Sequence, residues 1–203
     1  MGESKIGRRI WNHHRAHGGV LRNTRAGRKA RPISKKPIHL VLKARRECIP
    51  GGFRSPRRFK LVHEVCDRYC RRFFIKIEKM SLQGDHIHFL IRTSRRSGVQ
   101  NFLRVLAGQI AQRLESESLV RLYFRSANHR VVTDTSVNKK DVAVKKIKMW
   151  LHRPFTRLVW GRRDYRTVLN YIQLNEKEAQ GVIPYRKERL RGLSAGEWKI
   201  LWS

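Results

Sequence analysis

The stretch Gly84-Asp85-His86-Ile87-His88-Phe89-Leu90-Ile91 decides the fold. Successive side chains of a β-strand point to opposite faces of a sheet. As a strand, this stretch places its isoleucines and its phenylalanine on one face, towards helices, and His86 and His88 together on the open face. Two neutral imidazoles on a rigid strand can share one divalent ion. The alternative is a chance His-x-His pair on a solvated face, because such short patterns recur often. His39, on an earlier expected strand, is interpreted as a hydrogen-bonded core histidine, and the alternative is that it reaches the site of His86 and His88.

Strands and helices alternate on both sides of this stretch. A tight turn at 83–85 precedes it, and Ser55-Pro56 provides an N-cap and a first helical position. The expected strands cover residues 38–42, 73–78, 86–92 and 155–160. One expected helix begins at residue 56, and two others run from about 99 to 114 and from about 164 to 179. The order strand, helix, strand, strand, helix, strand, helix predicts an α+β fold of the ferredoxin-like kind, an antiparallel sheet with helices on one face.

The chain divides into three parts by composition. Residues 1–36 form a basic arm with few large apolar residues, which we expect to become ordered only on nucleic acid. Residues 37–181 form the compact domain, in which 116–148 are an insertion or a long β-ribbon. Residues 182–203 form a tail whose apolar side chains are expected to dock on the domain or on a second subunit.

The charge balance indicates a polyanionic partner. Lys and Arg number 47 against 15 Asp and Glu, a formal net charge of +32 that opposes compaction by self-repulsion. Nucleic acid fits best, because neutralised phosphates release counterions, whereas a single basic amphipathic segment would suffice for a membrane surface. The expected DNA contacts are Arg8, Arg9, Arg28, Arg31, Lys139, Lys140, Lys145 and Lys146.

The remaining composition indicates a cytoplasmic protein associated with the nucleoid and not with a membrane. No apolar run approaches the ~20 residues that cross a bilayer, and the basic N-terminus lacks the apolar stretch of a signal peptide. Three cysteines are too few for a disulfide framework and fit a reducing compartment.

A second motif, Tyr171-Ile172-Gln173-Leu174-Asn175, lies in the last expected helix. Tyr171 and Asn175 are four residues apart and therefore share one helix face, where a phenol can attack a phosphate beside an amide oxygen that binds a metal. The alternative is that Tyr171 packs its ring on the sheet. Tyr165 is the rival nucleophile on a different face of the helix. Gln173 is the rival ligand, but it points away.

Together the two motifs resemble the HUH transposases that use a single tyrosine, which include the transposases of the smallest bacterial insertion sequences and the REP-associated tyrosine transposases. Members of this family carry a strand with the pattern Asp/Asn-His-hydrophobic-His-Leu-hydrophobic, which residues 85–90 match, and a helix after it, which residues 99–114 match. A Trp and an aromatic strand come next, and residues 150–160 match them. The last motif is Tyr-Ile-x-x-Asn or Tyr-Ile-x-x-Gln, which residues 171–175 match. Gly84 replaces a frequent Pro, and Glu176 follows Asn175 where the REP-associated branch usually has Pro. Asn175 itself points to that branch.

The resemblance implies the HUH endonuclease fold and a metal-dependent enzyme that nicks and joins single-stranded or hairpin DNA. In it, Tyr171 forms a 5′-phosphotyrosine intermediate, and His86, His88 and Asn175 hold Mg²⁺ or Mn²⁺. A homodimer is implied, in which the tyrosine helix can serve the partner's site. The alternative is a non-catalytic basic nucleic-acid-binding protein, either ribosome-associated or a domesticated transposase. A rolling-circle replication initiator shares the His pair but usually carries further domains.

Overall fold

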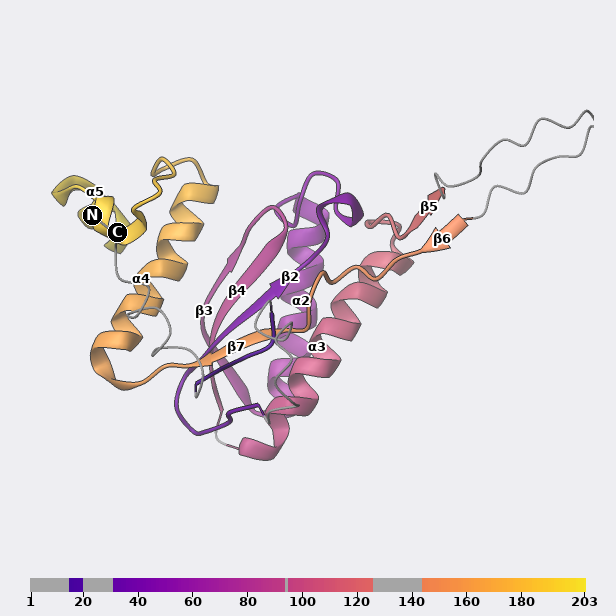
Figure 1. Cartoon of the computed structure of the whole chain (residues 1–203), viewed down its shortest axis with the longest axis horizontal. Coiled ribbons are helices and arrows are strands. Elements are labelled where there is room, and N and C mark those ends of the chain that lie inside the picture. Colours follow the sequence, from indigo (N-terminus) through magenta and orange to yellow (C-terminus); the bar gives the residue numbers. More distant parts are fainter. Residues whose placement is uncertain (1–14, 20–30, 94, 126–143) are drawn as a thin grey trace, which may run out of the picture.

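The computed structural model of the 203-residue chain describes residues 15–19, 31–93, 95–125 and 144–203 (Figure 1). The predicted DNA contacts Arg8, Arg9, Arg28, Lys139 and Lys140 lie outside these ranges. In chain order the elements are β1 (Ala16–His17), β2 (Ile38–Lys43), η2 (Arg46–Cys48), α2 (Pro56–Phe73), β3 (Ile75–Leu82), β4 (His86–Thr93), α3 (Arg96–Ser116), β5 (Tyr123–Arg125), β6 (Val144–Lys146), β7 (Phe155–Leu158), α4 (Gly161–Ala179), η3 (Arg189–Gly192) and α5 (Ala195–Trp202).

The main sheet has five strands in the order β1-β7-β2-β4-β3, and every neighbouring pair is antiparallel. Its four longer strands are those that the sequence predicted. They have the order expected of a ferredoxin-like sheet, with β2 and β4 in the centre. The predicted α+β antiparallel fold is therefore confirmed.

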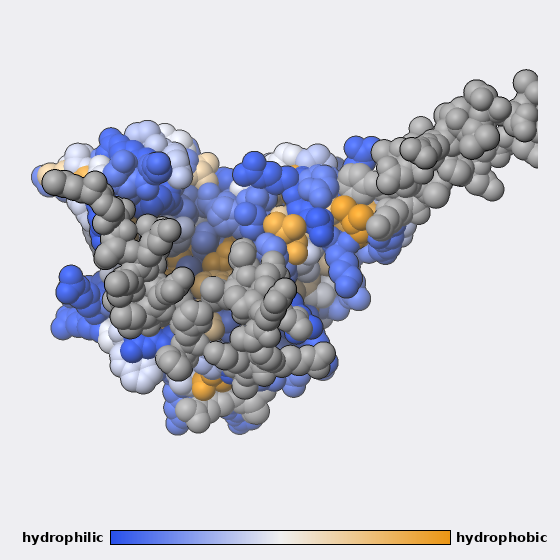
Figure 2. All heavy atoms as spheres, viewed as in Figure 1, coloured by the Kyte–Doolittle hydropathy of each residue, from blue (hydrophilic) through white to orange (hydrophobic). Residues whose placement is uncertain are grey.

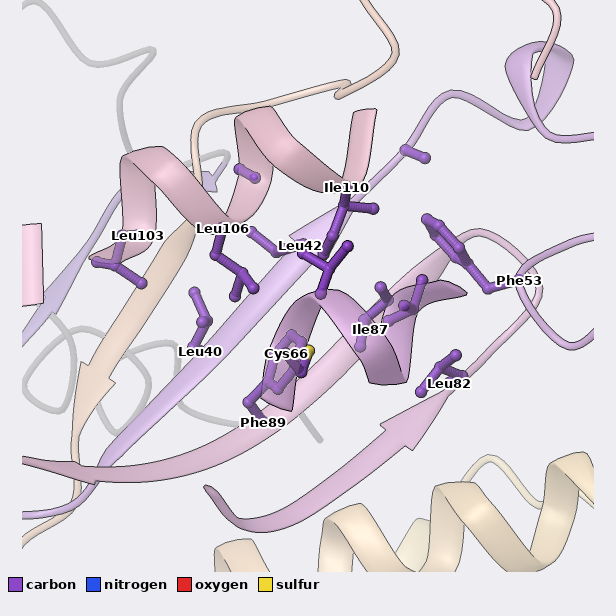
Figure 3. Close-up of a cluster of buried hydrophobic side chains, with 14 of the residues drawn as sticks. Leu40, Leu42, Phe53, Cys66, Leu82, Ile87, Phe89, Leu103, Leu106 and Ile110 are labelled. Atoms are coloured by element: carbon purple, nitrogen blue, oxygen red, sulfur yellow. The ribbon is translucent and has the colours of Figure 1, made fainter. Parts of the chain in front are cut away.

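The main core lies between one face of this sheet and the helices α2 and α3. Leu40 and Phe89 from the sheet meet Leu106 and Ile110 from α3, and all four are fully buried (Figure 3). Burying each such side chain contributes roughly 1.5–3 kcal/mol. The apolar residues of β4 therefore fix the sheet face on which α2 and α3 pack, as strand alternation predicted.

The helix α4 covers the opposite face of the sheet, which corrects the prediction that all helices lie on one face. Figure 1 shows the sheet between α4 and the pair α2 and α3. Val168 and Ile172 of α4 pack with Val159 on Leu90, which is fully buried although it shares the strand face of the two histidines. The apolar side of α4 needs a partner surface, and Leu90 provides it.

Several element boundaries differ from the predicted ones, and two of the differences have a clear local cause. Phe73 ends α2 and Phe74 takes a left-handed conformation with φ of 54°, so β3 begins at Ile75 instead of residue 73. The helix α4 begins at Gly161, three residues before the predicted start. There the Asp164 carboxylate accepts hydrogen bonds from the backbone N–H of Trp160 and from the guanidinium of Arg157, which stabilises the first turn.

The arm and the predicted insertion both contribute strands. β1 pairs with β7, which the polar composition of the arm did not predict. Arg31 also joins the arm to this edge, because its guanidinium donates to the Thr156 hydroxyl and to the Pro154 carbonyl. β5 and β6 form a separate two-stranded ribbon within the segment 116–148.

The tail docks on the domain of its own chain, which is one of the two expected arrangements; the other was docking on a second subunit. Leu201 of α5 is fully buried in a small cluster with Leu174 of α4 and Ile183. This cluster is separate from the main core, so α4 lies between the sheet on one side and the tail on the other (Figure 1).

The outer surface is mostly polar. The described part of the face in Figure 2 is largely hydrophilic, with only small apolar patches. Among the helices of the described ranges, none has the length and apolarity needed to cross a bilayer.

Candidate active site

The two histidines of β4 lie side by side under α4. Their rings are 4.8 Å apart and nearly perpendicular, at 84°. His86 begins the strand and is partly exposed, whereas His88 is only 5% exposed. The sheet face that carries the pair was expected to be open. It is instead largely covered, with access from the end of the strand that holds His86.

Asp85 fixes the orientation of His86. The His86 Nδ1 lies 2.6 Å from Asp85 Oδ1, and Arg46 Nε donates to the other carboxylate oxygen at 3.0 Å. Burial would raise the pKa of Asp85, but the hydrogen bonds from His86 and Arg46 outweigh it and lower that pKa. The carboxylate therefore stays charged and holds a proton on Nδ1 of His86, which leaves the Nε2 lone pair for a ligand.

His88 is held by a third histidine that the sequence did not assign to the site. His39 Nε2 lies 3.1 Å from His88 Nδ1, and the centres of the two rings are 5.4 Å apart. Burial lowers the pKa of His39 to about 4 and that of His88 well below its ordinary value, so both imidazoles are neutral near pH 7. The Nε2 atom of His88 is buried and has no hydrogen-bond partner among the described residues. A neutral imidazole with such an unpartnered nitrogen fits the donor that a metal ion requires.

Tyr171 faces this pair from α4. Its ring lies 5.5 Å from the His88 ring at 89°, and 6.3 Å from the His39 ring. The neighbouring Ile172 anchors α4 on the sheet, and Glu176 pairs with Arg54 at 3.0 Å. These contacts set the rotation of the helix, which brings Tyr171 to the imidazoles within one chain.

Asn175 lies one turn further along α4 and is buried, but its amide is already engaged. The Nδ2 group donates to the Tyr171 carbonyl at 2.8 Å, and Oδ1 accepts a hydrogen bond from Arg189. Gln173 donates to the Leu201 carbonyl, so it points away from the site as expected. Within the described ranges, no cluster of three or more His, Cys, Asp or Glu residues forms a metal site.

Tyr165, the rival nucleophile, lies beside a different group of residues. Its phenol interacts with Glu78 and Arg92, and its pKa is raised by burial and then by the charge of Glu78. A raised pKa disfavours the phenolate that attacks phosphorus. The geometry therefore brings Tyr171, not Tyr165, to the histidine pair.

Arg189, in the tail, is a site residue that no pattern in the sequence indicated. It has a positive φ of 57°, and its guanidinium lies 5.3 Å from the centre of the Tyr171 ring. Glu178 accepts two hydrogen bonds from it, both of 2.7 Å. A pocket of about 380 Å³ opens here, lined among others by His39, Tyr171 and Arg189. No local pattern marks Arg189, because its position depends on how the tail docks.

The described members of the predicted DNA-contact set differ in their surroundings. Arg31 is tied to the β7 edge by the bonds described above, and burial lowers its pKa to about 10. Lys146 is exposed and pairs with Glu115 at 2.5 Å. Lys145 lies on β6 opposite Phe124.

Comparisons with known proteins find similarity to transposases in part of the sequence and in the fold. Residues 34–124, which contain the histidine pair, match the family model described as "Transposase IS200 like". A solved structure of a REP-associated tyrosine transposase bound to a REP hairpin aligns with a TM-score of 0.51 at 12% identity, over 78% of this chain and 76% of that one. A Deinococcus radiodurans R1 protein described as a candidate transposase aligns with a TM-score of 0.35 at 15% identity, over 46% of this chain and 68% of that one.

A search of curated protein sequences found no match. The structural likeness to the REP-associated transposase supports the fold. Residues 34–124, a little less than half of the chain, are similar to the IS200-like transposase family.

Proposed function

We propose that this protein is a single-stranded DNA endonuclease and strand transferase that acts on hairpin or REP-like DNA. Tyr171 is the nucleophile, and it forms a 5′-phosphotyrosine intermediate. The observation that carries the proposal is the distance of 5.5 Å between the Tyr171 ring and the buried His88 ring, in a chain whose residues 34–124 match the IS200-like transposase model.

The histidine pair fits a divalent ion, Mg²⁺ or Mn²⁺. The Nδ1 atoms of His86 and His88 both face a protein partner, and the buried Nε2 of His88 has none among the described residues. Such an ion supplies polarisation of the scissile phosphate when it is bound. Asn175 is the proposed third ligand. Its Oδ1 atom accepts one hydrogen bond, from Arg189, and has a second lone pair that can bind an ion.

The protein residues perform the covalent step. The Tyr171 phenol loses its proton, and its oxygen forms a bond to phosphorus while the bond from phosphorus to the 3′ oxygen breaks. The 3′ oxygen leaves and takes up a proton. The phosphotyrosine ester conserves the bond energy, so attack by another 3′ hydroxyl rejoins a strand and frees Tyr171 without ATP.

The substrate assignment rests on access and charge. A tyrosine fixed on α4 must meet one phosphate in line, which a flexible single strand permits more readily than a stiff duplex. The net charge of +32 attracts the phosphate backbone, and exposed rings such as Trp202 offer stacking surfaces for unpaired bases. We assign phosphate contacts to the arm, to Lys139 and Lys140, and to Lys145 and Lys146.

The homodimer expected from the family remains a prediction. Because Tyr171 meets His88 within one chain, a partner is not required to bring these two groups together. Light scattering after size exclusion, with and without hairpin DNA, measures the assembly.

A gel assay tests the proposal. The protein is incubated with an end-labelled DNA hairpin that has a single-stranded flank, in Mn²⁺, and is run on a denaturing gel. We expect a covalent protein–DNA band that EDTA and Tyr171→Phe abolish and that the matched control Tyr165→Phe retains. A band that persists in Tyr171→Phe contradicts the proposal.

A non-catalytic nucleic-acid-binding protein is the second candidate, and the charge of +32 favours it equally. The same assay separates the two functions. Salt-sensitive binding of the hairpin without any covalent band, under conditions where Mn²⁺ binds, supports the binding protein.

A further inference from the structure

His39 occupies a position from which it can control His88. In the β2–β4 register, His39 pairs with Leu90 and Val41 pairs with His88, so the two histidines are diagonal neighbours on one sheet face. Diagonal neighbours on antiparallel strands are within reach of long side chains. His39 and His88 make such a diagonal contact, because His39 Nε2 lies 3.1 Å from His88 Nδ1 and both rings are buried.

The surroundings of His39 hold its ring in place. Phe155 lies edge-on to it at 6.4 Å and Tyr171 at 6.3 Å, while the His88 ring lies beside it in nearly the same plane, with 16° between the planes. His39 is 8% exposed. A ring packed on three sides by other rings cannot turn freely, so its hydrogen bond to His88 has a fixed direction.

That bond has two possible polarities, and they have opposite consequences for the site. If His39 donates from Nε2, then His88 carries its proton on Nε2. That N–H is buried and lacks a partner among the described residues, and its lone pair is lost to any metal. If His88 donates from Nδ1, then His39 accepts, and the Nε2 lone pair of His88 is free to bind an ion.

We propose that His39 is a positioning residue that accepts the His88 Nδ1–H proton and so keeps the His88 Nε2 lone pair directed at the metal. This inference rests on the proposed function, because the metal ion of that function is what the His88 Nε2 lone pair binds. The same arrangement recurs at His86, whose Nδ1 meets the Asp85 carboxylate at 2.6 Å. Each ligand of the pair thus has its own partner, a carboxylate for His86 and a neutral imidazole for His88. Partners of this kind fix the tautomer of metal-binding histidines.

The direct test is the tautomer of His88 in the metal-free protein. Two-bond ¹H–¹⁵N NMR spectra of ¹⁵N-histidine-labelled protein distinguish the two tautomers, and a His88→Gln variant assigns the signals. We expect the wild type to hold His88 with its proton on Nδ1. A wild-type His88 protonated on Nε2 overturns the proposal without any substitution at His39.

Two variants separate positioning from packing. His39→Gln keeps a carbonyl acceptor near the His88 Nδ1–H, whereas His39→Leu fills the space without one. We expect His39→Leu to shift His88 towards the Nε2–H tautomer and to weaken Mn²⁺ binding by about 10–100-fold, measured by Mn²⁺ electron paramagnetic resonance. His39→Gln should restore most of both. Equal effects of the two variants, or no effect of either, contradict the proposed role.

The measurement of the His88 tautomer does not depend on whether the protein cleaves DNA. If wild-type protein forms no covalent DNA band, the proposed function fails, while the His88 tautomer still decides the role of His39. If the band forms but His88 is protonated on Nε2 in the metal-free protein, only the present inference fails.

Discussion

The carboxylate of Asp85 has one oxygen on His86 and the other on Arg46, so its removal should affect the metal site more than the fold. We predict that Asp85→Ala lowers Mn²⁺ affinity about 10–100-fold, because His86 loses the partner that holds its Nδ1 proton. Asp85→Asn, which keeps an acceptor, should lose less. Mn²⁺ titration followed by paramagnetic resonance measures both, with the exposed Asp67→Ala as control. Unchanged affinity in Asp85→Ala contradicts this role.

At the same scale, local periodicity accounts for the site residues that could be predicted. Strand alternation put His86 and His88 on one face, and helical spacing set Tyr171 apart from Tyr165. The residues that the sequence did not assign to the site depend on non-local contacts. His39 reaches His88 only through the β2–β4 register, and Arg189 reaches Tyr171 only through the docked tail.

The helix α4 shows what the sequence can predict about single elements. Its existence and approximate end were predicted, but its side of the sheet was not. A signal was present in β4, because Leu90 is apolar although it shares the face of His86 and His88. A fully apolar residue among polar neighbours on a supposedly open face indicates that something covers that face, and α4 does so.

The small cluster around Leu201 predicts how the tail detaches. Leu201→Ala removes a fully buried side chain from a cluster separate from the main core, at a cost of about 2–5 kcal/mol. We expect α5 to undock while the sheet stays folded. Hydrogen exchange should accelerate in α5 but not in β2 or β4. Ile200→Ala, at a position 38% exposed, is the matched control and should change little. Accelerated exchange throughout the sheet of Leu201→Ala disagrees with a separate cluster.

For the molecule as a whole, buried neutral histidines predict sensitivity to acid. Burial lowers the pKa of His39 from 6.5 to about 4 in the folded state. The unfolded chain therefore binds more protons between these pH values. The stability from this group is complete above about pH 6.5 and declines as the pH falls towards 4, by about 3 kcal/mol in total.

Urea unfolding at pH 7.5 and at pH 4.5 measures this change in the free energy of unfolding. The variant His39→Gln has no titrating group at this position and should lose correspondingly less stability on acidification. An identical loss in wild type and variant means that the acid sensitivity arises elsewhere.

The central claim is that Tyr171 is the residue that becomes linked to DNA, and mass spectrometry of the linked peptide tests it directly. Trypsin separates the two candidates, because Tyr171 lies in the fragment 167–177 and Tyr165 in 164–166. After incubation with a DNA hairpin and Mn²⁺, followed by nuclease and trypsin, the account predicts a nucleotide phosphate on Tyr171. A nucleotide on Tyr165, or on neither tyrosine although hairpin DNA and Mn²⁺ are both bound, contradicts it.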